Sequence, residues 1–244
     1  MFQATAKTEI LKEIVDITAT LVSETKLNVS EDGIDLRTVD LAHVAMIDIN
    51  ISSSAFESFK SKDCELGVNL EKLKDVLRLS KTGEEIQLKH DEEKNRLVVN
   101  VGNITRMMAL VDTAGMSDPK VPNLDHKAVV TLKTAHLSRA IQATMGVSDL
   151  VCFIVRPDGL EIGADGYTDK VSVDLDKDKL ESLQCKEKVR SIFPLDYLNR
   201  IVKEIKSETT TLQLGNDYPV KLEFELANGS GRAVYLLAPH IENA

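Results

Sequence analysis

The sequence predicts an α+β protein of two similar domains, and three observations lead to this prediction. The chain repeats itself at an offset of about 126 residues, so that Lys7-Thr8 reappears as Lys133-Thr134 and Asp32-Gly33 as Asp158-Gly159. Four segments place apolar residues at the spacing of amphipathic helices, and the stretches between them alternate apolar and polar residues as strands do. A repeat this long indicates duplicated domains and not the short stacked units of a solenoid.

The length of 244 residues suits two domains that each hold a core. We expect the first domain over residues 1–112 and the second over residues 128–244. The residues between them, 113–127, include Gly, Asp-Pro and Val-Pro-Asn and show no helical or strand period. Prolines make such a segment extended and fairly stiff, so we interpret it as an interdomain linker.

Two helices are predicted in the first half, and each has an apolar and a polar face. The first begins near Thr8, a residue type that caps helices, and its apolar stripe is Ile10, Ile14, Ile17 and Leu21. The second is expected over residues 70–81. Its inward face is Leu70, Leu73 and Leu77, and its outward face is Lys74, Arg78 and Lys81.

Two helices are also predicted in the second half. The third begins at Thr134 and is expected to bury Leu137, Ala140 and Ile141 and to expose His136, Arg139 and Gln142. The fourth opens at Pro194, because proline is favoured in the first turn. It is expected to bury Leu195, Leu198, Val202 and Ile205 and to expose Asn199, Lys203 and Lys206. Each domain therefore packs two helices on antiparallel sheets.

Strict alternation predicts strands most clearly over residues 45–51 and 220–226. Further strands are expected near residues 86–89, 96–101, 104–111, 128–132, 151–155, 171–175, 209–214 and 232–238.

The charge balance bears on the class of partner. The formal net charge is -9, with 30 basic residues, and nucleic-acid binding is driven by basic side chains that displace counterions. A basic patch on one face of an acidic protein would still admit DNA at that face alone.

The sequence shows no membrane span and no targeting segment, so we expect a soluble protein. Cys64, Cys152 and Cys185 lack paired spacing and are interpreted as three reduced thiols.

The motifs of common enzyme classes are absent from the sequence. It has no phosphate loop, dinucleotide-binding turn, paired zinc histidines or nucleophile elbow. Asp158-Gly159 and Asp165-Gly166 are read as turns, because acidic partners do not recur at calcium-loop spacing. We therefore expect a protein that is not an enzyme and that has no metal, cofactor or catalytic residue.

Four segments, in order and in register, resemble one family. They are residues 33–44 (GIDLRTVDLAHV), 66–78 (LGVNLEKLKDVLR), 193–203 (FPLDYLNRIVK) and 237–242 (LAPHIE). These segments resemble DNA polymerase sliding clamps of the proliferating cell nuclear antigen (PCNA) type. The resemblance implies the DNA clamp, or processivity, fold: three chains form a pseudo-six-fold ring whose helices line a hole around duplex DNA.

The resemblance also implies a function and partners. Such a ring tethers DNA polymerase and other replication and repair enzymes to DNA and so confers processivity. Expected partners are duplex DNA without sequence preference, two further copies of the chain, and DNA polymerase, a clamp loader of the replication factor C type, flap endonuclease and DNA ligase, which bind through short hydrophobic peptides (the PIP box). No membrane partner is expected. The acidic composition favours an archaeal cytoplasm with nucleoid association; a eukaryotic relative would be nuclear.

The resemblance assigns residues to three surfaces. The DNA-facing set is Lys12, Lys72, Lys74, Arg78, Lys81, Arg139, Arg200, Lys203 and Lys206. Several relatives carry basic residues where this chain has Glu13, Ala19, Asp75 and Gln142, so a weakly basic inner face is expected. The partner-peptide groove is Val39, His43, Val44, Met46, Val121, Pro122, Pro219, Leu236, Ala238 and Pro239. The subunit interface pairs Ile104, Arg106, Met108 and Leu110 of one chain with Lys170, Val171, Val173 and Leu175 of the next.

Two other classes of protein remain open at this point. The acidic balance fits a duplicated protein-interaction scaffold that does not encircle DNA. A small-molecule enzyme is the third alternative, although the sequence shows no site for one.

Overall fold

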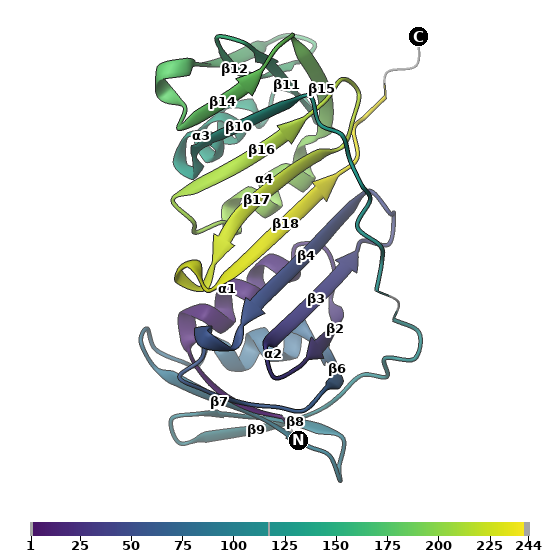
Figure 1. Ribbon diagram of the computed structural model, residues 1–244, viewed down its shortest axis with the longest axis vertical. Coiled ribbons are helices and arrows are strands. Elements are labelled where there is room, and N and C mark those ends of the chain that lie inside the picture. Colours follow the sequence, from purple (N-terminus) through teal and green to yellow (C-terminus); the bar gives the residue numbers. More distant parts are fainter. Residues whose placement is uncertain (1, 117, 242–244) are drawn as a thin grey trace. The chain divides into compact units, whose positions relative to one another are not determined.

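The computed structural model describes residues 2–116 and 118–241, and the chain divides into two compact units (Figure 1). Unit 1 is Met1–Val121 with Glu225–Ala233, and unit 2 is Pro122–Phe224 with Val234–Ala244. Ser117 of the expected linker and residues 242–244 of the expected second domain lie outside the described residues. Residues 225–233, late in the sequence, thus belong to the unit that is built mainly from the first half.

Unit 1 contains two α-helices, α1 (Thr8–Thr18) and α2 (Leu70–Leu77), which contact each other. Its strands are β1 (Gln3–Lys7), β2 (Glu24–Val29), β3 (Gly33–Val39), β4 (Ala45–Ser52), β5 (Ser58–Lys60), β6 (Cys64–Asn69), β7 (Glu85–Asp91), β8 (Arg96–Val101) and β9 (Ile104–Ala109), with a short 3-10 turn η1 (Ser53–Ala55). One antiparallel sheet has the order β5-β1-β7-β8-β9, and β4, β3, β2 and β6 are neighbours in another.

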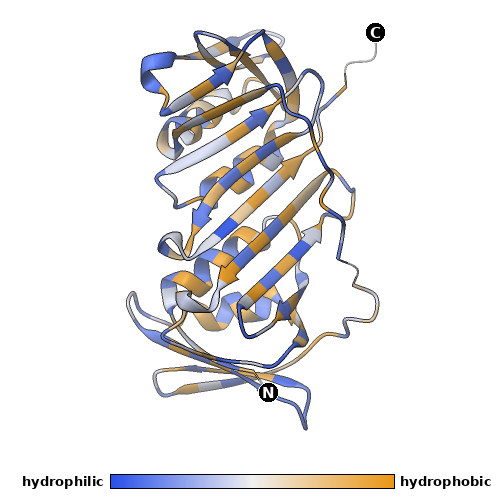
Figure 2. Cartoon of the chain, viewed as in Figure 1, coloured by the Kyte–Doolittle hydropathy of each residue, from blue (hydrophilic) through white to orange (hydrophobic). Residues whose placement is uncertain are grey.

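The packing of unit 1 follows from its residue periods. On β4, Ile47, Ile49 and Ile51 are fully buried, while Asp48 and Asn50 between them reach solvent, because successive side chains of a strand point to opposite faces. The same alternation is visible along the strands in Figure 2. Ile10, Ile14 and Ile17 of the predicted stripe are buried on α1, whereas Leu21 is half-buried. Each buried Leu or Ile contributes about 1.5–3 kcal/mol of transfer free energy.

Unit 2 repeats this plan. It contains α3 (Thr134–Thr144) and α4 (Leu195–Glu204), which contact each other, and the strands β10 (Ala128–Lys133), β11 (Leu150–Arg156), β12 (Gly159–Asp165), β13 (Lys170–Asp176), β14 (Ser182–Cys185), β15 (Val189–Pro194) and β16 (Thr209–Leu214). β17 (Val220–Leu226) and β18 (Gly231–Leu237) have residues in both units; η2 (Lys177–Lys179) and η3 (Ala227–Gly229) are short 3-10 turns. One antiparallel sheet has the order β13-β12-β11-β15, and β14, β10, β16 and β17 are neighbours in another.

The two units confirm the predicted fold class. α1 and α3 begin at Thr8 and Thr134, and β3 and β12 begin at Gly33 and Gly159, at the offset found in the sequence. In each unit two helices pack together on antiparallel sheets. The predicted strands over 96–101, 209–214 and 220–226 have the observed bounds.

Two details predicted for α1 are wrong. The N-cap residue is Lys7, and the hydroxyl of Thr8 donates instead to the carbonyl oxygen of Glu84 at 2.9 Å. The helix ends at Thr18, whose hydroxyl donates to the Ile14 carbonyl oxygen at 2.7 Å, so Leu21 lies in the turn that follows.

The C-terminal ends predicted for α2 and α4 are also wrong. α2 ends at Leu77, because the buried Ser80 hydroxyl donates to the Leu77 carbonyl oxygen and the chain then turns, which leaves Lys81 beyond the helix. α4 ends at Glu204, so Lys206 also lies outside its helix. Both lysines were predicted on helical faces, but a turn follows α2 and the backbone becomes extended at Ile205 after α4.

Candidate functional site

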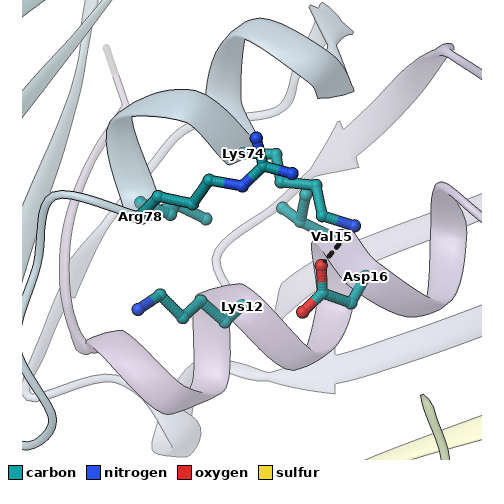
Figure 3. Close-up of a pocket in the computed structure, with 6 residues that line it drawn as sticks. Lys12, Val15, Asp16, Lys74 and Arg78 are labelled. Atoms are coloured by element: carbon teal, nitrogen blue, oxygen red, sulfur yellow. Dashed lines mark ion pairs between the residues drawn. The ribbon is translucent and has the colours of Figure 1, made fainter. Parts of the chain in front are cut away.

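The polar faces of α1 and α2 enclose a small pocket of about 110 Å³. Its apolar floor is Val15 and Leu77, and its charged rim is Lys12, Asp16, Lys74 and Arg78. Figure 3 shows the rim side chains of the two helices facing one another. Lys12 and Asp16 on α1, and Lys74 and Arg78 on the α2 side, are each four residues apart, so each pair shares one helix face.

Ion pairs across and beside the pocket balance most of its charge. Lys74 Nζ lies 2.7 Å from Asp16 Oδ1, which joins the two helices, and Arg78 Nη1 lies 3.2 Å from Asp75 Oδ1 on its own helix. Lys12 Nζ donates to the Ser80 carbonyl oxygen at 3.4 Å. The Arg78–Asp75 pair is exposed. Exposed ion pairs contribute little net stability, so an incoming anion can replace Asp75 at low cost.

The remaining residues of the predicted DNA-facing set lie at several places. Lys72 is exposed on α2, and Lys81 lies in the turn after it. In unit 2, Arg139 is exposed on α3 and Lys203 on α4. Arg200 of α4 pairs with Asp196 at 3.1 Å and lies over the ring of Tyr197, with its guanidinium carbon 4.7 Å from the ring centroid. Lys206, beyond the end of α4, is exposed as well.

Glu13 does not lie on the polar face of α1, which corrects the expectation from the resemblance. Glu13 is only 8% exposed, and its Oε2 accepts a hydrogen bond from the backbone N–H of Ala227 at 3.0 Å. Glu13 comes three residues after Ile10 and four before Ile17, so the helical period already placed it on the apolar stripe.

The predicted groove residues of unit 1 surround the turn between β3 and β4. Val39 and Met46 are paired across the two strands, and Val44 is half-buried. His43 is exposed and has a left-handed backbone with φ of 56°. The buried carboxylate of Asp40 holds this turn by accepting three backbone N–H groups, from Ala42, Val44 and Ala45 at 3.2, 2.8 and 2.7 Å.

The sequence analysis missed a residue in this turn. Leu41 is fully exposed at the tip, and Val121 of the expected linker is 38% exposed. Both are apolar side chains held in solvent, but periodicity offered no signal for Leu41 because it precedes the strand.

The other groove residues belong to unit 2. Leu236 is buried, Pro219, Ala238 and Pro239 are half-buried, and Pro122 is exposed. His126 Nε2 donates to the Pro219 carbonyl oxygen at 2.9 Å. Burial is the main cause that lowers the pKa of His126, so the ring is neutral at neutral pH with its proton on Nε2.

The predicted interface residues lie on β9 and β13, except Leu110, which directly follows β9. Each of these two strands is an edge strand of its sheet. Ile104 is 39% exposed, Arg106 is half-buried and Leu110 follows the end of β9. On β13, Lys170 is exposed and Val171 and Val173 are half-buried. Met108 and Leu175 are 6% and 7% exposed and therefore pack inside their own units, while Met107, missed by the sequence analysis, is 56% exposed.

The described residues contain no group of three or more His, Cys, Asp or Glu side chains arranged to hold a metal ion. Within the same residues, no helix is long and apolar enough to cross a membrane.

Duplicated α+β units, with paired helices that carry cations on a polar face, define the DNA clamp class of fold. Two family models match the chain: "Proliferating cell nuclear antigen, N-terminal domain" over residues 1–113 and "Proliferating cell nuclear antigen, C-terminal domain" over residues 120–240. The chain belongs to the proliferating cell nuclear antigen family.

Curated relatives from archaea are similar over their whole length. Proteins called "DNA polymerase sliding clamp" from Methanocella arvoryzae and Natronomonas pharaonis are 38% and 36% identical to this chain, with all of both chains covered in each case.

Solved structures agree with the fold. PCNA of A. fulgidus, solved with the C-terminal region of FEN-1 bound, is 30% identical over all of both chains with a TM-score of 0.94. PCNA from Thermococcus kodakaraensis has a TM-score of 0.91 over 98% of this chain and all of its own; at 22% identity it supports the fold alone.

Proposed function

We propose that this chain is a sliding clamp: three copies close into a ring around duplex DNA and tether DNA polymerase and other replication and repair enzymes to it. The observation that carries the proposal is the cationic pocket of Lys12, Lys74 and Arg78 on the paired helices of a chain whose net charge is -9. A cationic site on one face of an acidic protein directs DNA to that face. Family membership and the names of the relatives support the same assignment.

The contacts with DNA are to phosphates and carry no sequence preference. Lysine and arginine side chains bind phosphate oxygens, and such contacts position a duplex without reading its bases. The proposed set is Lys12, Lys72, Lys74, Arg78, Lys81, Arg139, Arg200, Lys203 and Lys206. Because a closed ring stays on DNA by topology, weak phosphate contacts are sufficient, and they permit sliding.

The ring closes by strand pairing between subunits. β9 of one chain pairs with β13 of the next through the proposed interface residues, and a head-to-tail contact of this kind closes a ring when the rotation between subunits allows. Pairing also covers two sheet edges that would otherwise promote aggregation. The ring then consists of six domains, with boundaries at residues 1–112 and 128–244 in each chain.

Partner enzymes bind through short hydrophobic peptides in a groove beside the linker of residues 113–127. The proposed groove comprises Val39, His43, Val44, Met46, Val121, Pro122, Pro219, Leu236, Ala238 and Pro239. An aliphatic groove anchors a short peptide helix, and the linker offers backbone groups to it. The clamp has no catalytic role of its own and raises the local concentration of its partners at the primer end. We place it in an archaeal cytoplasm with the nucleoid.

Retention on DNA tests the proposal. A loaded clamp should remain on circular duplex DNA and leave after the circle is cut at constant salt. Light scattering should give three times the chain mass of 26.9 kDa. A monomer that is released equally from circular and linear DNA would reject the clamp and favour a scaffold that does not encircle DNA.

A further inference from the structure

The first part of the linker is fastened to the body of unit 1 by a polar cluster. Lys26 of β2 lies at its centre, with its Nζ 2.8 Å from Asp118 Oδ2 and 3.2 Å from Glu65 Oε1. Asn28, two residues along the same strand, donates its side-chain amide to Asp118 Oδ1 at 3.1 Å. Asp118 therefore uses both carboxylate oxygens to bridge from the linker to one strand. We call the pairing of Asp118 with Lys26 the linker latch.

The burial of the latch is unequal. The Lys26 side chain is 9% exposed and that of Asp118 is 40% exposed. The hydrogen bond from Lys26 is the main cause that lowers the pKa of Asp118, and the bond to Asp118 is the main cause that raises the pKa of Lys26. Both groups are thus charged at neutral pH. A nearly buried lysine requires a charged partner, and here the linker supplies one of two.

Neighbouring contacts hold the same segment. Arg37 Nη1 donates to the Pro119 carbonyl oxygen at 3.4 Å, and the Thr113 hydroxyl donates to Glu65 Oε2 at 3.4 Å. These bonds are long, so the short charged contact at Asp118 is the strongest attachment among them.

A second linker carboxylate provides a comparison within the chain. Asp125 pairs with Lys127, two residues away, so this ion pair is local to the linker. Asp118, in contrast, pairs with a residue 92 positions earlier in the sequence. Val121, a proposed groove residue, follows Asp118 by three residues and is exposed.

We propose that Asp118 is a positioning residue for the partner-peptide groove, because the linker latch holds Asp118 and Pro119 on unit 1 and thereby fixes the start of the segment that carries Val121. This inference rests on the proposed function, which assigns the groove. A pre-ordered linker binds a peptide more tightly, since less conformational freedom is lost at binding.

The loss of Asp118 should affect the linker more than the fold. Lys26 retains Glu65 as its partner, so the buried cation is not left alone. We expect Asp118→Ala to weaken peptide binding by about 3- to 10-fold. A loss of this size matches the conformational entropy cost of ordering one or two more side chains when the peptide binds. Asp118→Asn, which retains the shape and one acceptor oxygen, should give an intermediate value.

The test measures hydrogen exchange of the linker in the free protein and calorimetric affinity for a synthetic peptide of the C-terminal region of FEN-1. Asp118→Ala should lower the exchange protection of residues 111–121 and weaken binding, and the matched control Asp125→Ala should do neither. The difference between wild type and Asp118→Ala should shrink as salt is raised toward 1 M, where the Debye length falls to about 3 Å.

The outcomes separate the two proposals. Equal exchange in wild type and Asp118→Ala would overturn the linker latch, whatever the peptide does. Lowered protection with unchanged affinity would overturn the positioning role alone. A wild-type protein that binds no peptide would overturn the proposed groove, and with it the positioning role, while the exchange data would still decide whether Asp118 holds the linker.

Discussion

Replacement of Lys74 and Arg78 by alanine should remove most of the cationic character of the α1–α2 pocket. The pocket and its neighbour Asp75 hold three cations (Lys12, Lys74 and Arg78) and two carboxylates (Asp16 and Asp75), which gives a net charge of +1. The double substitution leaves one cation and two carboxylates, a net charge of -1. The pocket should then repel a phosphate instead of binding it.

The size of the effect follows from counterion release. Each cation that neutralises a phosphate contributes about 0.9 to the slope of log K against log salt for duplex DNA. Two cations give about 1.8 as an upper bound. Lys74 and Arg78 are already paired at 2.7 and 3.2 Å, so part of the gain is offset by the exchange of partners. We expect the slope to fall by about 1, below this upper bound, for the surface in contact with DNA.

Fluorescence anisotropy of a short linear duplex, over about 50–200 mM salt, measures this slope. Lys89→Ala with Arg96→Ala is the matched control, because these exposed residues lie on β7 and β8 and the same charge is lost. An equal fall in both double variants would show that only the total charge matters and would refute the assignment of the pocket. An unchanged slope in the helix variant would refute it too.

The reverse change should strengthen binding. Asp16→Asn removes the carboxylate that pairs with Lys74 and raises the net charge of the same set of residues from +1 to +2. The anisotropy slope should steepen by up to about 1. A weaker or unchanged affinity would mean that Lys74 does not reach the DNA.

Three further predictions concern stability and pH. Glu13→Ala leaves the N–H of Ala227 without its acceptor and should lower the free energy of unfolding by about 1–3 kcal/mol in urea titration. Gly67→Ala should also destabilise unit 1, by about 1–3 kcal/mol, because the added Cβ would lie 2.1 Å from the Val111 carbonyl oxygen and the backbone would have to shift to relieve the overlap. The pKa of His126 in the folded protein lies below its ordinary value of 6.5, so at a given pH the unfolded chain holds this proton more often than the folded protein does. The free energy of unfolding should therefore decrease as the pH drops below 6.5 toward the folded-state pKa. His126→Gln should weaken this pH dependence.

The first two of these predictions each have a control in the same chain. Glu13→Gln retains an acceptor oxygen and should cost much less than Glu13→Ala. Gly115→Ala meets no atom within 4 Å and should be neutral. Equal effects in a variant and its control would contradict the structural reason given for that variant.

The sequence was sufficient for the strands and helices in which one face is apolar and the other polar. β17 has the predicted bounds because its apolar and polar residues alternate completely, and burial alternates in the same way along β8 and β16, whose bounds were also predicted. β2 was not among the predicted strands, since Thr25 and Lys26 are both buried and its pattern does not alternate. The buried Lys26 is tolerated through its contacts with Asp118 and Glu65, which lie far away in the sequence.

Helix ends were harder to predict than helix faces. The pattern of α2 continues past Leu77, but the Ser80 hydroxyl binds the Leu77 carbonyl oxygen and the backbone turns. The ion pairs of Lys74 and Arg78 required the paired helices to be seen in space. The residues that form the three proposed surfaces were suggested by the family resemblance, and their roles stay predictions.

The bond between Glu13 and Ala227 joins residues 214 positions apart, and Glu225–Ala233 complete unit 1. During synthesis Ala227 therefore leaves the ribosome 214 residues after Glu13. The amino-terminal part of unit 1 stays incompletely assembled until Glu225–Ala233 have emerged. Contacts between residues so far apart slow folding, because the chain must lose the entropy of closing a long loop before these contacts can stabilise it. A fragment ending at the linker would lack Glu225–Ala233, so unit 1 depends on a segment from the second half of the sequence to be complete.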